Sequence, residues 1–227
     1  MTLQNTRRAA LAALAVVGAM LLAASQASAF TITTTFSNWK VTGSLTPKKL
    51  NEPVTLPEGS TFNGTAEIFL GKPTTGTMTG TVFVPPFKAP VKLLGLVPTT
   101  VGTTFTQVGP ANGTILSDPE TADCAGQAGA GCLTVKVLTK ANLGFTSAGV
   151  EGLSVPTQCV TAEPVSFELV EHQTLSELIL TGPHFAGTTT IPEIKCEGLE
   201  FALGLVYTQL LSGPENPYQL SIAPALS

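Results

Sequence analysis

Apolar and polar residues alternate with a period of two along several parts of this chain. The clearest runs are residues 133–138, 165–169 and 218–222, where Leu, Val, Ile, Phe and Tyr recur at every second position. Successive side chains of a β-strand point to opposite faces of a sheet, so this alternation is typical of strands that bury one face. The pattern therefore predicts an all-β fold built from antiparallel strands.

Two segments depart from simple alternation. Apolar residues up to Phe36 share one parity and those from Trp39 onward share the other, which predicts a β-bulge near residues 37–38. Between residues 199 and 211 the apolar residues fall at helical spacing, and Gly213 with the following proline supplies a stop signal. We expect a short buried helix there, followed by a final strand.

Turn-forming residues separate the strand runs. The Asn-Gly pairs at 63–64 and 112–113 favour tight hairpin turns, because both residue types tolerate positive φ. Together these features predict a sandwich-like arrangement of antiparallel sheets with one short C-terminal helix. We expect residues 30–227 to form one domain. The alternative is two small β domains that divide near residues 117–123.

The first 29 residues have the organisation of a secretory signal peptide. Arg7 and Arg8 precede an uncharged, Ala- and Leu-rich stretch that ends in the small-x-small pattern at Ala29. A membrane-anchoring helix is the alternative, although the stretch falls short of about 18 apolar residues. The arginine pair is compatible with twin-arginine export or with the ordinary route. We expect a mature protein that is secreted or associated with the cell envelope, without a transmembrane segment.

Charge argues against binding of nucleic acid. After residue 29 the chain has nine lysines and no arginine against fifteen acidic residues, a net charge of −6. Phosphate contacts from Lys and Arg dominate affinity for nucleic acid, and planar recognition of anions favours the Arg guanidinium. We therefore expect no nucleic-acid partner.

Four cysteines remain after the expected cleavage: Cys124, Cys132, Cys159 and Cys196. In an oxidising compartment an even number predicts two disulfides, with three possible connectivities. A Gly-rich segment separates Cys124 from Cys132 and its ends close easily, so we favour Cys124–Cys132 with Cys159–Cys196. Their spacing does not match a zinc site, and we expect no metal or cofactor.

Several phrases in the C-terminal third occur together: residues 154–159, residues 187–192 with Cys196, and residues 211–218. This set resembles a family of uncharacterised secreted β-rich proteins of actinobacteria. The resemblance implies an exported location and a Cys159–Cys196 disulfide. It implies no activity and no site residues.

Catalytic patterns are weak. The segment around Ser154 ends in proline where a nucleophile elbow needs glycine. His172 has the parity of a solvent-facing strand residue, and His184 follows Gly-Pro and is expected in a turn. The acidic cluster from Asp118 to Asp123 could serve as a weak calcium site, but a solvated loop explains it more simply. We predict no enzyme activity. A divergent hydrolase that uses Ser154 or this cluster with His172 is the alternative.

One long apolar stretch, residues 82–101, suggests binding. It is punctuated by prolines, which favour edge strands or bulges. Its simplest interpretation is a pair of buried strands joined by a turn at Gly95. The functional alternative is a surface for a hydrophobic small molecule, such as a lipid or glycolipid, for an envelope component, or for a protein. The residues proposed for that surface are Phe83, Phe87, Leu93, Leu94 and Leu96.

These observations predict a non-enzymatic binding or structural protein that acts through its surface. The first alternative is a carrier that binds a hydrophobic ligand between its sheets.

Overall fold

The computed structural model describes residues 30–93, 97–117, 132–150, 153–197 and 201–224. Strands dominate these residues and two helices accompany them, which confirms the predicted all-β class. The elements are β1 (Phe30–Leu45), β2 (Val54–Thr55), β3 (Thr61–Leu70), β4 (Thr75–Phe83), β5 (Phe87–Leu93), β6 (Val97–Gln107), β7 (Ala111–Ser117), β8 (Cys132–Val150), β9 (Leu153–Thr161), β10 (Val165–Thr174), α2 (Leu175–Leu180), β11 (His184–Ile191), β12 (Ile194–Cys196), α3 (Phe201–Leu211) and β13 (Gly213–Ala223).

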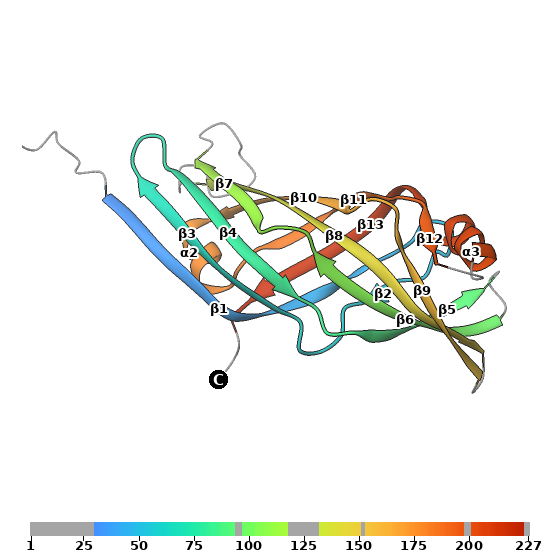
Figure 1. Cartoon of the computed structure of the whole chain (residues 1–227). Coiled ribbons are helices and arrows are strands. Elements are labelled where there is room, and N and C mark those ends of the chain that lie inside the picture. Colours follow the sequence, from blue (N-terminus) through green and yellow to red (C-terminus); the bar gives the residue numbers. More distant parts are fainter. Residues whose placement is uncertain (1–29, 94–96, 118–131, 151–152, 198–200, 225–227) are drawn as a thin grey trace, which may run out of the picture.

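All described strands belong to one antiparallel sheet that folds over on itself (Figure 1). The main strand order is β11-β13-β1-β3-β4-β7-β8-β6-β5. The first half of β8 pairs with β7 and β10, and its second half pairs with β6 and β9. Because β10 pairs with β8 and also lies beside β11, the β11 end of the sheet comes back next to its middle, and the sheet surrounds a common core. The two layers of the sandwich-like arrangement are parts of one sheet.

The period-two alternation corresponds to burial. Inward rows on β8, β10 and β13 include Val135, Phe167 and Tyr218, which are all buried, while their sequence neighbours are partly or fully exposed. Residues on both sides of segment 118–131 contribute to one continuous hydrophobic cluster. The alternation thus identified the core-facing side of these strands.

The predicted bulge in β1 is confirmed. The register with β3 shifts between Phe36 and Trp39, and Asn38 adopts a positive φ of 52°. The Asn63 side chain accepts a hydrogen bond from the Asn38 backbone N–H at 2.8 Å. The extra residues bring Phe36 and Trp39 into an edge-to-face contact with ring centroids 4.7 Å apart.

The predicted hairpin turns at 63–64 and 112–113 are wrong, since these residues lie within β3 and β7. Gly64 pairs with Gly80 of β4, and the ring of Phe62 lies close to both glycines. A Cβ at Gly64 would lie 2.7 Å from the Phe62 ring. The glycine is therefore needed for close packing within the sheet rather than for positive φ.

The predicted C-terminal helix is confirmed as α3, and β13 follows it as the final strand. The other helix, α2, was not predicted. It begins with a capping box in which the Thr174 hydroxyl accepts from the Glu177 backbone N–H and the Glu177 carboxylate accepts from the Thr174 backbone N–H. The hydrogen bond that the Glu177 carboxylate accepts from the Thr174 backbone N–H, and secondly the one that it accepts from the Thr174 hydroxyl at 2.9 Å, lower the pKa of Glu177. The helices of the described residues are too short to cross a bilayer.

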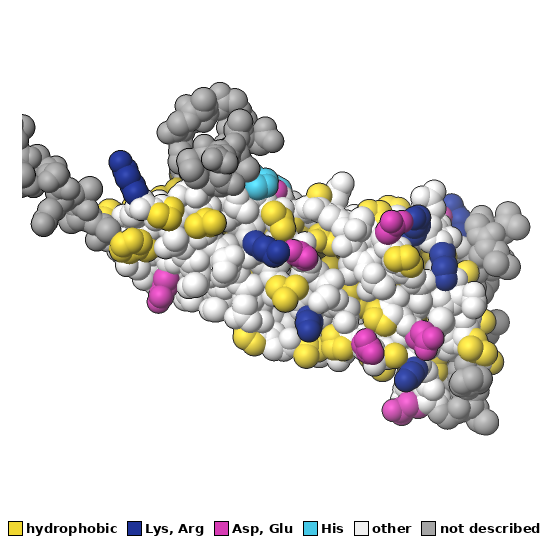
Figure 2. Space-filling view, turned by 90° about the horizontal axis from the view of Figure 1, so that it is seen from above, with side chains coloured by type: hydrophobic (Ala, Val, Ile, Leu, Met, Phe, Trp, Pro, Cys, Tyr) yellow, Lys and Arg dark blue, Asp and Glu magenta, His cyan; other side chains and the backbone are white. Residues whose placement is uncertain are grey.

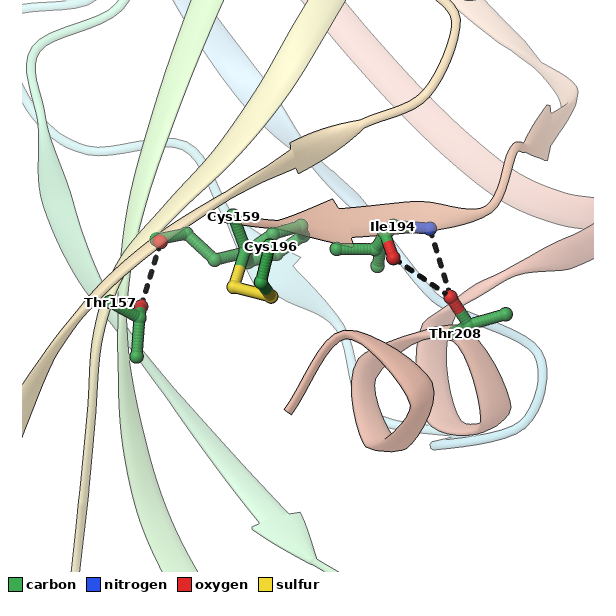
Figure 3. The surroundings of a disulfide bond; sticks show 6 residues. Thr157, Cys159, Ile194, Cys196 and Thr208 are labelled. Atoms are coloured by element: carbon green, nitrogen blue, oxygen red, sulfur yellow. Dashed lines mark hydrogen bonds between the residues drawn. A yellow bond between two sulfur atoms is a disulfide. The ribbon is translucent and has the colours of Figure 1, made fainter. Parts of the chain in front are cut away.

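A disulfide joins Cys159 of β9 to Cys196 of β12, directly opposite each other in the ladder (Figure 3). This confirms one predicted pairing. Cys132 begins β8, whereas Cys124 lies outside the described residues, so the Cys124–Cys132 pairing stays a prediction.

The disulfide lies against α3. A Cβ at Gly204 would lie 3.3 Å from the Cys196 sulfur, and the Thr208 hydroxyl bonds both the backbone N–H and the carbonyl of Ile194 at 2.9 and 3.2 Å (Figure 3). The covalent link between β9 and β12 therefore also holds the strand on which α3 rests.

We expect the double variant Cys159→Ala, Cys196→Ala to lose about 2–4 kcal/mol of unfolding free energy, because the bond closes a chain separation of 37 residues. Urea unfolding followed by circular dichroism measures the loss. A variant with unchanged midpoint and slope would show that the link adds no stability to the fold.

Candidate functional site: an apolar cavity in the core

A cavity of about 140 Å³ lies between the facing layers of the sheet. Strands β1 and β13 line one side, and β5, β6, β8 and β10 line others. Helix α3 and the segment 46–60, which connects β1 to β3, complete the wall. The cavity is partly enclosed and reaches solvent. It therefore offers a sheltered apolar space to a molecule from outside.

No lining residue in the described part of the chain is charged, and nearly all are aliphatic or aromatic. Aromatic rings form several contacts in the wall. Phe145 stacks on Tyr207 with ring centroids 5.1 Å apart. Phe167 makes a T-shaped contact with Tyr218, with ring centroids 5.5 Å apart. These rings come from β8, α3, β10 and β13, so packing of four elements shapes the space.

Thr139 is an exception in the wall. It follows Leu133, Val135 and Val137 in the inward row of β8 and is only 6% exposed. Its Oγ1 atom is buried and has no hydrogen-bond partner among the described residues. A buried hydroxyl without a partner costs about 1–3 kcal/mol, so this position is not optimised for stability alone.

We expect Thr139→Val to raise the unfolding free energy by about 1 kcal/mol, because valine has nearly the same shape and no hydroxyl to desolvate. Urea unfolding checks this. Thr157→Val is a matched control, since the Thr157 hydroxyl donates to the Phe145 carbonyl at 2.8 Å and its loss should destabilise the protein. A destabilised Thr139→Val protein would contradict the assignment of an unpartnered hydroxyl.

The segment 46–60 is tied down at both sides of the cavity. Its short strand β2 pairs with the end of β1. Across the cavity, the Glu52 carboxylate accepts from the backbone N–H of Lys92 at 3.0 Å and lies 3.2 Å from its ammonium. Lys92 belongs to β5, so this contact joins the segment to the end strand of the main sheet path.

Side chains close the junction between β10 and β11. No backbone ladder joins these two described strands. The Tyr218 hydroxyl donates to the Glu168 carbonyl at 2.5 Å, and the Thr189 hydroxyl donates to the Ser166 carbonyl at 2.7 Å. Burial, and secondarily the charge of Glu168, raise the pKa of Tyr218. Tyr218, a residue of β13 that lines the cavity, thus also joins β13 to β10.

We expect Tyr218→Phe to cost about 1 kcal/mol at pH 8, where the hydroxyl donates its hydrogen bond. A raised pKa favours the protonated phenol in the folded state. Its contribution is complete below the unfolded pKa of about 10 and declines as pH rises above it. The difference between the two proteins should therefore narrow between pH 8 and pH 10.5 in urea unfolding. A constant difference would argue against the raised pKa.

The surface proposed from the apolar stretch is only partly brought together. Phe87 lines the cavity, whereas Phe83 is 59% exposed at the end of β4. Leu93 is the last residue of β5, and Leu94 and Leu96 lie outside the described residues. Strands β5 and β6 form the predicted antiparallel pair, with Ala89, Val91 and Val101 buried.

Ser154 and His172, which the hydrolase alternative pairs, lie far apart in the sheet. His172 lies opposite Thr134 near the start of β8, and Ser154 lies opposite Gly149 near its end. Fifteen residues of strand separate these positions, a distance on the order of 50 Å. Asp118 and Asp123 lie outside the described residues. The structure therefore gives Ser154 no histidine base in His172.

The two histidines occupy exposed strand positions. His172 bonds the Thr134 hydroxyl through Nδ1 at 3.0 Å. His184 is the first residue of β11 rather than part of a turn, and its Nδ1 lies 2.8 Å from the Ser221 hydroxyl. Burial raises the pKa of nearby Glu171, while His184 and His172 oppose that shift. No group of three metal-binding side chains occurs among the described residues.

One outer face of the described residues has a mixed surface. Figure 2 shows one face, on which hydrophobic side chains are scattered and lysines lie among acidic residues. Exposed apolar residues of this kind are normal on proteins, and mixed charge gives no single-sign field for a polyanion.

The sequence analysis did not single out Thr139, although the alternation pattern contained a signal for it. Its parity continues the apolar row of residues 133–137, so a threonine at that position was recognisable as a polar residue on the core side. The cavity itself had no signal along the chain, because its wall combines residues from nearly every part of the sequence. Comparison of the chain with models of protein families, with curated proteins and with solved structures found no match.

Proposed function

We propose that the mature chain is an exported, non-enzymatic protein that binds a small hydrophobic molecule in the cavity of its core. The cavity is the observation that carries this proposal. Protein interiors are normally packed as densely as organic crystals, so a space of about 140 Å³ is unusual. Apolar cavities of about 150 Å³ in other proteins stay dry and bind benzene-sized molecules.

Energetics favour occupancy. Side chains around an apolar space lack neighbouring atoms on one side, and a fully closed cavity of this volume would cost on the order of 3 kcal/mol. A bound apolar molecule would restore the lost contacts and remove its own surface from water. The wall residues come from both layers and from α3, so side chains held by the fold define the shape before any ligand arrives.

Other features support export. The N-terminal 29 residues have the pattern of a signal peptide, and the Cys159–Cys196 disulfide is of the kind that persists in oxidising compartments. The separation of Ser154 from His172 supports a role in binding rather than hydrolysis. A ligand carried at the envelope or outside the cell fits both observations.

The proposal is tested by filling the cavity. We expect the wild-type protein to bind the uncharged apolar dye N-phenyl-1-naphthylamine with enhanced fluorescence. Ala89→Phe should abolish binding of the uncharged dye N-phenyl-1-naphthylamine, because Ala89 is buried in the wall and a phenyl ring there takes up the free volume.

The control is Lys88→Phe, which adds the same ring to the exposed neighbouring position of β5. It should bind the dye like the wild type, and both variants should unfold cooperatively in urea. If Ala89→Phe folds and retains dye affinity, the cavity is not the binding site.

A further inference from the structure

We infer that the ligand is an uncharged molecule with an apolar body and one oxygen-bearing group, and that Thr139 is the residue that selects for this group. The inference rests on the proposed binding function and specifies the ligand class of the same cavity. The inference is based on the charge and the hydrogen bonds of the wall residues.

The wall excludes ionised groups. Among the described residues, no side chain that lines the cavity carries a charge that could pair with a buried ion. An unpaired carboxylate or ammonium in such a space loses several kcal/mol of hydration, so a charged ligand group would stay in water or bind in its neutral form. The part of the ligand inside the cavity is therefore neutral.

Two polar groups of the wall already have partners. The Tyr218 hydroxyl donates to the Glu168 carbonyl, and the Thr103 hydroxyl contacts the Val101 carbonyl at 3.4 Å. Thr139 differs, because its buried hydroxyl has no partner within the described residues while its side chain lines the cavity. A ligand could pair with this hydroxyl without breaking a hydrogen bond of the wall.

Threonine is suited to this task. The Oγ1 atom shows almost no surface in the ligand-free structure, but rotation about χ1 exchanges the positions of the hydroxyl and the methyl group. A hydroxyl both donates and accepts, so it can pair with a hydroxyl, carbonyl or ether oxygen. Valine at this position would avoid the cost of the unpartnered group, whereas a hydrogen bond from a ligand would remove that cost and keep the hydroxyl.

The test is a chemical double-mutant cycle with phenol and toluene, which have nearly the same shape and differ in a hydroxyl against a methyl group. Each is titrated into the wild type, Thr139→Val and Thr139→Ser by calorimetry or ligand-observed NMR. We expect Thr139→Val to weaken phenol binding about five- to tenfold and to leave toluene binding unchanged or tighter. Thr139→Ser keeps the hydroxyl and should retain the preference for phenol.

Benzoate tests the exclusion of charge and should bind at least tenfold more weakly than phenol at pH 7. If toluene binds, and the ratio of phenol affinity to toluene affinity is the same in the wild type and Thr139→Val, the role of Thr139 is overturned. The proposed function then still stands. If benzoate binds as tightly as phenol, and toluene competes with it for the same site, the proposal that the ligand is uncharged is overturned. Failure of both toluene and phenol to bind a folded wild type at millimolar concentration would instead contradict the proposed function itself.

Discussion

The long strand β8 is the element on which the arrangement of the others depends. Over its 19 residues it pairs with β7 and β10 and then with β6 and β9, so it belongs to both regions of the folded sheet. Its inward row supplies Leu133, Val135 and Val137 to the packed core and then Thr139, Leu143 and Phe145 to the cavity wall. A register slip of one residue would turn this row outward and remove core and cavity wall together. The hydrogen-bond ladders on both sides of β8 therefore also determine which residues surround the cavity.

Two kinds of link hold the cavity wall where the sheet alone does not. At the end that carries α3, the Cys159–Cys196 disulfide and the Thr208 hydrogen bonds fix β12 and with it the helix that contributes Tyr207 and Leu211. Near the junction of β10 and β11, the Tyr218 hydroxyl of β13 donates to the Glu168 carbonyl of β10, a strand with which β13 shares no ladder among the described residues. Both links use few atoms and leave the space between the layers open. The protein thus gives up some packing energy in its centre while it keeps the surrounding wall stable, a balance that is common at binding sites.

Local signals in the sequence predicted much of the fold. Alternation predicted the inward faces of β8, β10 and β13, the change of parity predicted the bulge before Trp39, and the apolar spacing predicted α3. Each of these depends on neighbours within a few residues. The turn predictions failed because an Asn-Gly pair also occurs within a strand where an aromatic ring packs against the glycine. The Phe62 ring packs against Gly64 in this way. Helix α2 was missed although Thr174 and Glu177 have the spacing of a capping box, because its six residues are too few to show a period.

The sequence by itself determined the strand character of the chain, the face of each strand that avoids water, the cysteines that can pair and the absence of arginine after residue 29. These are properties of residue type and of near neighbours, which the chain carries before it folds. Only the tertiary structure decided that the inward rows fail to meet completely and leave a cavity, that Phe87 faces it while Phe83 does not, and that Thr139 lacks a partner. The reason is that a cavity is the volume left between side chains from distant parts of the chain, and that volume depends on sheet twist, register and the placement of α3 together.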